Sequence, residues 1–437
     1  MRKSDHNSDT RPLGTTYLSR LHPYPAMVAD ELACSLVKRF VPQHAKILDP
    51  FCGSGRLLAA AEGASLRVGV DANPLAWLLT TTKFTKIDSA KIKKILLSLR
   101  EAQRATPKMP SSIGTGRKVE WFSRRVAKEL NRIVFWINSL KLQEPEKLLV
   151  ASILSATVRE VSFARLDGWK LHRLDAKARS SLKLCPWERF EKRLGYCLEE
   201  LATARPTLGR TLVALEDARS LSRTGRGSVS EAGPYDIVLT SPPYGDSQST
   251  VQYGAASSLC MSVVSGLKGL EHLGLPGRSI DNGCLGGGGE VSVSIPYMKK
   301  YWAGSLQNRF GRALARFLAD YDKACASIAT NLKPGGTAIF VVGRRSTGGY
   351  RLKLDKFTID RLSARGFELI RTEKRGLQQK HAPRIVNRFA RDAERKHQRS
   401  AQVLTMDSEI IVVMKKKRLR SSLISRAPSG SSRSTVQ

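Results

Sequence analysis

The chain has 437 residues, a formal net charge of +35 and an isoelectric point near 10.3. That length is ample for a hydrophobic core and predicts more than one domain, and the charge disfavours an ordinary metabolic enzyme and indicates a polyanionic partner, nucleic acid above all. The seven cysteines are scattered without a CxxC pair, which predicts reduced thiols and no zinc site. No apolar run approaches the ~18 residues that span a membrane, and the first residues lack a signal-peptide core, so we expect a cytoplasmic protein.

The first predicted elements alternate between helix and strand. Residues 1–14 are polar and predict a flexible arm. Apolar residues that recur on one helical face predict a helix from Met27 to Phe40. Apolar runs predict strands at 45–49 and 66–70, and residues 57–61 between them have high helix propensity. The chain therefore begins as an α/β pattern.

A glycine-rich turn follows the first strand, at residues 49–55 (DPFCGSG). Gly53 and Gly55 allow a backbone to approach a ligand where a Cβ would clash. The helix that follows offers free N–H groups at its N-terminus to a carboxylate or phosphate. The spacing is neither the GxGxxG fingerprint nor a P-loop, and a turn of structural origin is the alternative. We expect Cys52 to be a small buried residue.

Two acidic residues follow later strands. Asp71 ends the second strand about 20 residues after the glycine turn, where an acid can accept hydrogen bonds from ribose hydroxyls. It also fits the N-cap of a helix that starts at Ala72-Asn73-Pro74. Asp217 follows the apolar run 212–215 and could accept from an adenine amino group, although a surface turn fits its spacing equally well.

Residues 87–205 interrupt the α/β alternation. Helical patterns at 126–136 and 147–158 predict a helical insertion between the second and third strands. We expect this insertion to recognise the nucleic-acid target. Arginine and lysine side chains can bind phosphates or read guanine edges, and a solvated helix face is the alternative. The candidates for DNA binding are Arg159, Arg165, Lys170 and Arg173.

The α/β pattern resumes with predicted strands at 210–216 and 235–240. The stretch 245–300 contains four consecutive glycines and predicts an irregular segment, either a second target contact or a lid. A helix over 308–331 is expected to stop at Lys333-Pro334-Gly335-Gly336, before a strand at 337–342.

The predicted sheet closes near the C-terminus. Phe367–Ile370 and Glu409–Met414 have the pattern of an antiparallel pair. Basic residues around 371–399 could hold phosphates. Residues 415–437 are basic and serine-rich, which predicts a disordered tail.

The strand at 235–240 runs into Thr240-Ser241-Pro242-Pro243-Tyr244. The two prolines remove two backbone donors and fix two φ angles, so the loop is rigid. Such a loop can hold a flat ring while nearby oxygens accept hydrogen bonds from an exocyclic amine. Taken alone, the segment also fits a polyproline turn.

Together these motifs resemble those of the S-adenosylmethionine-dependent DNA amino-methyltransferases. Residues 49–55 are similar to their DPFxGSG cofactor motif, and residues 240–244 to the TSPPY catalytic motif of the cytosine-N4 enzymes. Residues 21–26 (LHPYPA) resemble the His-Pro segment that packs near the methionine end of the cofactor. DPPY is commoner among adenine-N6 enzymes, so Ser241 favours cytosine. The resemblance covers most of 15–86 and 210–345.

The resemblance implies a class I (Rossmann-like) methyltransferase sheet, with a catalytic domain over 15–86 and 206–414. It implies S-adenosylmethionine as the cofactor and double-stranded DNA as the partner of a monomer associated with a bacterial or archaeal nucleoid. A cognate restriction endonuclease is a candidate partner. The predicted cofactor-binding residues are His22, Pro23, Asp49, Phe51, Gly53, Gly55, Asp71 and Asp217, and the predicted catalytic residues are Ser241, Pro242, Pro243 and Tyr244.

The expected reaction is methylation of the N4 amine of a cytosine that has flipped out of the duplex. We expect the Ser241 hydroxyl and the Pro242 carbonyl to accept from the amine and the Tyr244 ring to stack on the base, without a metal. Alternatives are an adenine-N6 DNA methyltransferase, an RNA amino-methyltransferase and a non-catalytic DNA-binding protein of the same fold.

Overall fold

The structure is a computed structural model of the 437-residue chain. It describes residues 18, 20–104, 120–166, 171–203, 209–221, 229, 232–245, 253–274, 280–288, 295–305, 307–347, 350–376, 385–388, 401–404 and 408–418. The predicted arm at 1–14 and the predicted tail beyond residue 418 lie outside these ranges.

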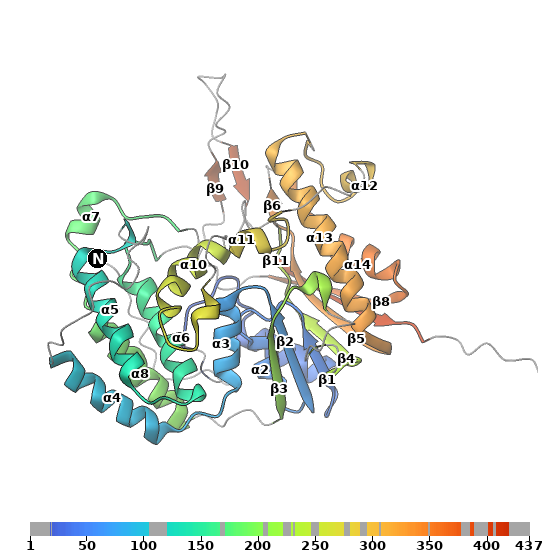
Figure 1. Ribbon diagram of the computed structural model, residues 1–437. Coiled ribbons are helices and arrows are strands. Elements are labelled where there is room, and N and C mark those ends of the chain that lie inside the picture. The colour runs from blue at the N-terminus through green and yellow to red at the C-terminus, as the bar shows by residue number, and fades with distance from the viewer. Residues whose placement is uncertain are drawn as a thin grey trace, which may run out of the picture.

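A seven-stranded sheet forms the centre of the fold, in the order β3-β2-β1-β4-β5-β11-β8 (Figure 1). Strands β3, β2, β1, β4 and β5 run parallel, and β11 lies antiparallel between β5 and β8. This order confirms the predicted α/β sheet of the class I, Rossmann-like type and its closing antiparallel pair. The strands are β1 (Lys46–Asp49), β2 (Leu66–Asp71), β3 (Arg210–Leu215), β4 (Tyr235–Thr240), β5 (Leu332–Gly343), β8 (Phe367–Gly376) and β11 (Ser408–Lys416).

Two short strand pairs lie outside this sheet. β6 (Ser346–Thr347) pairs antiparallel with β7 (Tyr350–Arg351), and β9 (Ile385–Arg388) pairs antiparallel with β10 (Ala401–Leu404). The second pair belongs to the connection between β8 and β11, where sequence analysis expected only a basic segment.

The helices and 3-10 turns connect these strands in chain order. They are α1 (Asp30–Phe40), α2 (Arg56–Ala60), α3 (Pro74–Phe84), α4 (Ser89–Arg104), α5 (Arg124–Ser139), α6 (Glu144–Val161), α7 (Ala176–Ser180), α8 (Pro186–Thr203), η2 (Ala218–Ser220), α10 (Tyr253–Val264), η3 (Glu271–Leu273), α11 (Ile280–Gly283), α12 (Ile295–Lys299), α13 (Arg309–Asn331) and α14 (Leu354–Ser363).

Helices cover both faces of the sheet because its strands are apolar on both faces. Along β4, Ile237 and Leu239 pack in the cluster that contains α1 and α2, whereas Val238 packs in the cluster that contains α13 and α14. Successive side chains of a strand point to opposite faces, and parallel strands buried on both sides form continuous apolar runs. The apolar runs of the sequence thus produce a three-layer core.

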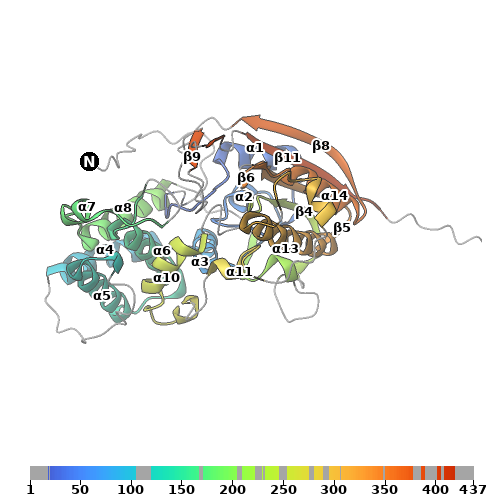
Figure 2. The same cartoon turned by 90° about the horizontal axis from the view of Figure 1, so that it is seen from above.

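A separate helical cluster lies beside the sheet, as both views show (Figures 1 and 2). Helices α4, α5, α6 and α8 share one hydrophobic core with α3 and α10. α6 is buried along nearly its whole length, from Leu148 to Val161, and it carries apolar residues on every side. A helix that is hydrophobic all round lies inside a core. α4 to α8 follow β2 and precede β3, in the range where the sequence predicts the helical insertion.

Three local predictions are wrong. The stretch 245–300 contains a 12-residue helix, α10, which packs against α6 and α3 and has no amphipathic period because most of its sides are buried. Strand β5 begins at Leu332, because the turn glycines are accommodated by a register shift against β4 with Gly335 at φ +79°. Lys415 and Lys416 are the last residues of β11, not the start of a tail.

Candidate active site

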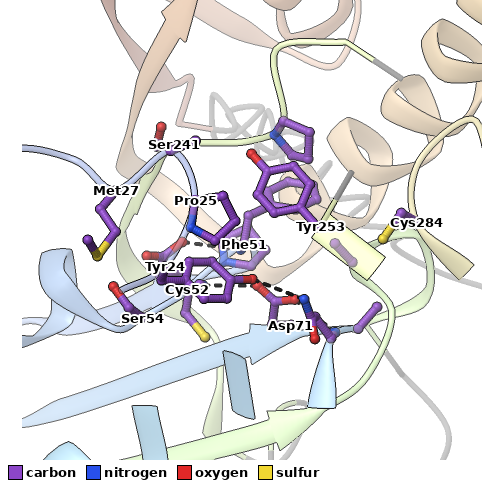
Figure 3. A pocket seen from close by; sticks show the side chains of 18 of the residues that line it. Tyr24, Pro25, Met27, Phe51, Cys52, Ser54, Asp71, Ser241, Tyr253 and Cys284 are labelled. Carbon is purple, nitrogen blue, oxygen red and sulfur yellow. Dashed lines mark hydrogen bonds between the residues drawn. The ribbon is translucent and has the colours of Figure 1, made fainter. Parts of the chain in front are cut away.

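A cavity opens where strands β1, β2, β3 and β4 end (Figure 3). The order of the sheet places β1 between β2 and β4, so the direction in which successive strands are added reverses between β1 and β4. Ligands of open α/β sheets bind beyond the carboxyl ends of the strands at such a point. Seven predicted residues line the cavity: Asp49, Phe51, Gly53, Asp71, Asp217, Ser241 and Pro243.

The glycine loop between β1 and α2 forms one wall. Gly53 has φ +52°, and a Cβ added there would lie 3.2 Å from the ring of Tyr24. Gly55 has φ +75°, and a Cβ there would lie 2.9 Å from the Thr80 side chain. Because glycine has no Cβ, α3 can pack closely behind the loop. Gly55 does not line the cavity. Its role is the conformation of the loop.

Two side chains from α3 hold this loop from behind. The hydroxyl of Thr80 donates to the carbonyl of Gly53 at 2.8 Å, and Lys83 Nζ donates to the carbonyl of Ser54 at 2.7 Å. Lys83 is buried, and burial lowers its pKa to about 7. The loop is therefore fixed before any ligand binds.

Asp49 ends β1 and joins the two motifs. Its Oδ1 accepts hydrogen bonds from the Thr240 hydroxyl at 2.6 Å and from the Phe51 N–H at 3.2 Å. Burial raises the pKa of Asp49 to about 7, although both hydrogen bonds act in the opposite direction. Asp49 thus fixes the loops that follow β1 and β4 relative to each other.

Asp71 ends β2 and points into the cavity (Figure 3). It accepts hydrogen bonds from the N–H groups of Gly53 at 2.9 Å and Asn73 at 2.9 Å. Burial raises its pKa to about 6. A carboxylate has about four acceptor positions, so Asp71 retains capacity for ligand hydroxyls. The N-cap of α3 is Asn73, whose side chain accepts from Leu75 N, and not Asp71.

Asp217 lies two residues after β3 and is held by Arg219. The guanidinium donates to both carboxylate oxygens of Asp217 and also to the buried Asp320 of α13 at 2.8 Å. It donates further to the carbonyl of Gly283, at the end of α11. Asp217 lines the cavity on one side, and Gly283, Cys284 and Leu285 line it on another. Arg219 therefore connects two walls of the cavity through its hydrogen bonds.

The loop after β4 contributes Ser241 and Pro243 to the cavity, whereas Pro242 is buried and Tyr244 does not line it. The Tyr244 hydroxyl lies 3.0 Å from Ser241 Oγ and donates to Glu409 of β11 at 3.1 Å. The Tyr244 ring packs against the core cluster that contains α13 and α14. In this structure the aromatic rings at the cavity are instead those of Tyr24, Phe51 and Tyr253.

The His-Pro segment contributes different residues from those predicted. His22 is 4% exposed, its Nδ1 bonds to the carbonyl of Pro23, and neither residue lines the cavity. Burial and the nearby Arg193 lower the pKa of His22 to about 3, so it is neutral. The cavity residues follow directly in sequence: Tyr24, Pro25, Ala26, Met27 and Val28. The sequence could have indicated these residues, because they directly follow the His-Pro pair.

Comparison with known proteins agrees with the geometry. The chain is 28% identical over 373 residues to the Type II methyltransferase M.MvaI of Kocuria varians, covering 78% of this chain and 79% of that protein. It is 33% identical over 86 residues to the Type II methyltransferase M.MjaII of Methanocaldococcus jannaschii, covering 20% of this chain and 16% of that one. Over most of its length the chain is therefore similar to a Type II methyltransferase. No protein-family model matches it.

The solved structures that align with the chain are distant from it. The rRNA methyltransferase aviRa from Streptomyces viridochromogenes aligns with 90% of this chain and 88% of its own, at 11% identity and a TM-score of 0.33. A methyltransferase from Thermoplasma acidophilum, described as putative, aligns with 52% of this chain at 13% identity and a TM-score of 0.20. Scores this low support no argument about substrate.

The predicted DNA-binding residues differ from one another in their surroundings. Arg159 lies in α6 and is 5% exposed, and burial lowers its pKa, so the structure contradicts its prediction as a phosphate contact. Arg165 and Arg173 are exposed on the two sides of a short antiparallel bridge between Ala164 and Arg173. Lys170 lies outside the described residues.

Two findings concern only the described part of the chain. There, no group of three His, Cys, Asp or Glu side chains is arranged to hold a metal ion. None of the helices described combines the length and the apolar composition needed to cross a membrane.

Proposed function

We propose that the protein is a site-specific DNA methyltransferase that transfers the methyl group of S-adenosylmethionine to the N4 amine of cytosine. The observation that carries the proposal is that residues of both motifs line one cavity. Asp71 and the glycine loop form one part of it, and Ser241 and Pro243 another. A methyl donor and an acceptor ring must meet in one place, and this cavity brings the two sets of residues together.

The residues present suit this cofactor. Asp71 retains acceptor capacity for ribose hydroxyls, Asp217 can accept from an adenine amine, and Gly53 lacks the Cβ that would crowd the Tyr24 ring at the cavity wall. The rings of Tyr24 and Tyr253, whose centroids are 6.3 Å apart, offer faces to an adenine or a sulfonium. When bound, S-adenosylmethionine supplies a methyl group activated for transfer.

The chain itself supplies orientation for the acceptor base. The lone pair of the cytosine amine is delocalised into the ring. A group that accepts hydrogen bonds from the amine N–H is therefore needed to orient the lone pair toward the methyl group. We propose Ser241 Oγ as that acceptor, because it lines the cavity on a loop made rigid by two prolines and by the Thr240–Asp49 bond. Alignment of the reacting atoms supplies much of such a rate enhancement. The base must leave the duplex to reach the cavity, at a cost of a few kcal/mol.

The relatives named above and the net charge of +35 support DNA as the substrate. A type II relative also makes a cognate restriction endonuclease a proposed partner. Ser241 in place of an acidic residue supports cytosine over adenine. The exposed Arg165 and Arg173 on the helical side of the molecule are proposed phosphate contacts.

The test is methyl transfer from labelled S-adenosylmethionine to DNA and RNA in parallel, followed by nucleoside analysis. We expect labelled N4-methylcytosine from DNA, and a rate at least roughly 100-fold lower for Ser241→Ala. Ser180→Ala, an exposed serine of α7, is the matched control. N6-methyladenine would overturn the choice of base, and label in RNA alone would overturn the choice of nucleic acid. Absence of label from both would leave a non-catalytic binding protein.

A further inference from the structure

A chain of hydrogen bonds leads from the cavity into the sheet. Ser241 Oγ, at the cavity wall, lies 3.0 Å from the Tyr244 hydroxyl, which donates to Glu409 Oε1 at 3.1 Å. Glu409 is the second residue of β11, is 9% exposed and lies 165 positions from Tyr244. Glu409 lies outside the TSPPY motif, and the motif does not predict this contact.

The charge of Glu409 determines the direction of every bond in this chain. An ionised carboxylate only accepts, so the Tyr244 O–H must point at Glu409. Burial and the neighbouring Glu409 raise the pKa of Tyr244, which keeps that proton in place. The Tyr244 oxygen is then free to accept, and the Ser241 O–H donates to it. The Ser241 lone pairs are left facing the cavity.

Protonation of Glu409 permits the opposite direction. A neutral carboxyl can donate to Tyr244, Tyr244 can then donate to Ser241, and Ser241 turns its own O–H toward the cavity. A donor at that position opposes an amine, which also presents hydrogens. The same three residues can therefore accept or repel an amine, depending on one proton.

We propose that Glu409 is a positioning residue that makes Ser241 a hydrogen-bond acceptor for the target amine. The inference rests on the proposed function, because it assumes that an amine occupies the cavity. It assigns a role in binding the target amine to Glu409 of β11, a strand that contains none of the motifs.

The surroundings of Glu409 make its ionisation adjustable. Burial raises its pKa, while the Tyr244 hydrogen bond and Arg375 lower it. Arg375 lies opposite Glu409 in the pairing of β11 with β8, with Nη1 3.7 Å from Oε2. On the other side, Glu409 is paired with Gly343 of β5, which has no side chain. Arg375 is thus the cation that favours the ionised state.

The first experiment uses the protein alone. Infrared titration of the carboxyl band, as wild type minus Glu409→Gln, reports the ionisation of Glu409 without substrate. Arg375→Gln removes the cation and is expected to raise the titration midpoint. Thermal melts of all variants verify folding. An unchanged midpoint in Arg375→Gln would overturn the electrostatic part of the inference.

The second experiment measures methyl transfer to DNA against pH. We expect the wild-type kcat to fall on the acid side with the infrared midpoint, and Arg375→Gln to move that limb to higher pH. In Glu409→Gln the amide oxygen should face Arg375 and its NH₂ should face Tyr244, which reverses the chain. We expect kcat at least roughly 10-fold lower, without the acid limb, and unchanged affinity for S-adenosylmethionine.

Glu368→Gln, an exposed glutamate of β8, is the matched control and should behave as wild type. A Glu409→Gln enzyme that keeps the wild-type rate and acid limb would overturn this inference alone. A wild-type protein that methylates neither DNA nor RNA would instead overturn the proposed function, and the role of Ser241 with it.

Discussion

The hydroxyl of Thr240 donates a 2.6 Å hydrogen bond to Oδ1 of Asp49, and both side chains are buried. The two residues are 191 positions apart and end the neighbouring strands β4 and β1. Each belongs to one of the two motifs that line the cavity. This bond ties the two motifs together, so disturbing either residue should affect both the cofactor side and the catalytic side.

Asp49 should make stability depend on pH. Its folded pKa of about 7 lies above the ordinary value of 3.8, so the folded protein binds a proton that the unfolded chain has lost between about pH 4 and pH 7. Stability from this group is present below pH 4 and lost as the pH rises to 7, by up to about 1.4 kcal/mol per pH unit. Urea unfolding of wild type and Asp49→Asn at several pH values measures the difference. Parallel curves for the two proteins would contradict the prediction.

Arg219 should stabilise both the fold and the cavity. Arg219→Leu leaves the buried carboxylate of Asp320 without this cation and releases the Gly283 carbonyl. We expect a loss of about 2–4 kcal/mol, since removal of one partner leaves an uncompensated charge. Arg219→Lys keeps the charge without the bidentate contact to Asp217 and should lose less. The measurement is chemical denaturation, and a loss below ~0.5 kcal/mol would refute the expectation.

Tyr253 should contribute to cofactor binding through its ring. It lines the cavity at the start of α10, near Tyr24. Tyr253→Ala removes a ring whose packing contributes about 0.5–1.5 kcal/mol beyond its buried area, so binding of S-adenosylmethionine should weaken by roughly tenfold. Tyr253→Phe keeps the ring and should bind nearly as wild type. Calorimetric titration separates the two, and equal affinities in all three proteins would exclude the ring from the site.

Exposed and buried arginines should differ in their effect on DNA binding. Arg165→Ala and Arg173→Ala should each weaken binding across all sequences and lower the salt slope of log K by about 1. Arg159→Ala, at a buried position of α6, should lower stability and leave the salt slope unchanged. Binding measured over a range of salt concentrations tests both statements. A lower slope for Arg159→Ala alone would reverse the assignment.

Much of the sheet was predictable because its information is local. Apolar runs predicted β1, β2, β3, β4 and the closing pair, since a strand buried on both faces needs an unbroken apolar sequence. Asp49, Asp71 and Ser241 were predictable as neighbours in space because the ends of parallel strands meet at one edge. The predicted end of the helix at 308–331 was right, because α13 ends at Asn331, but the strand that follows starts at Leu332 and not at 337. Its pairing with β4 begins at Leu332 and resumes at Thr337 after a register shift, which no local pattern records.

The sequence by itself determined the strand ends, the rigidity of the proline loop and the glycines whose positive φ angles shape the other loop. Tertiary structure alone decided which side chains are buried and which partner each one finds. α10 carries no helical period because it is enclosed on most sides, Arg159 looks like any basic surface residue until α6 is placed inside the cluster, and the partner of Tyr244 comes from a strand 165 positions later. Burial and long-range pairing depend on the packing of whole layers, and no local pattern records them.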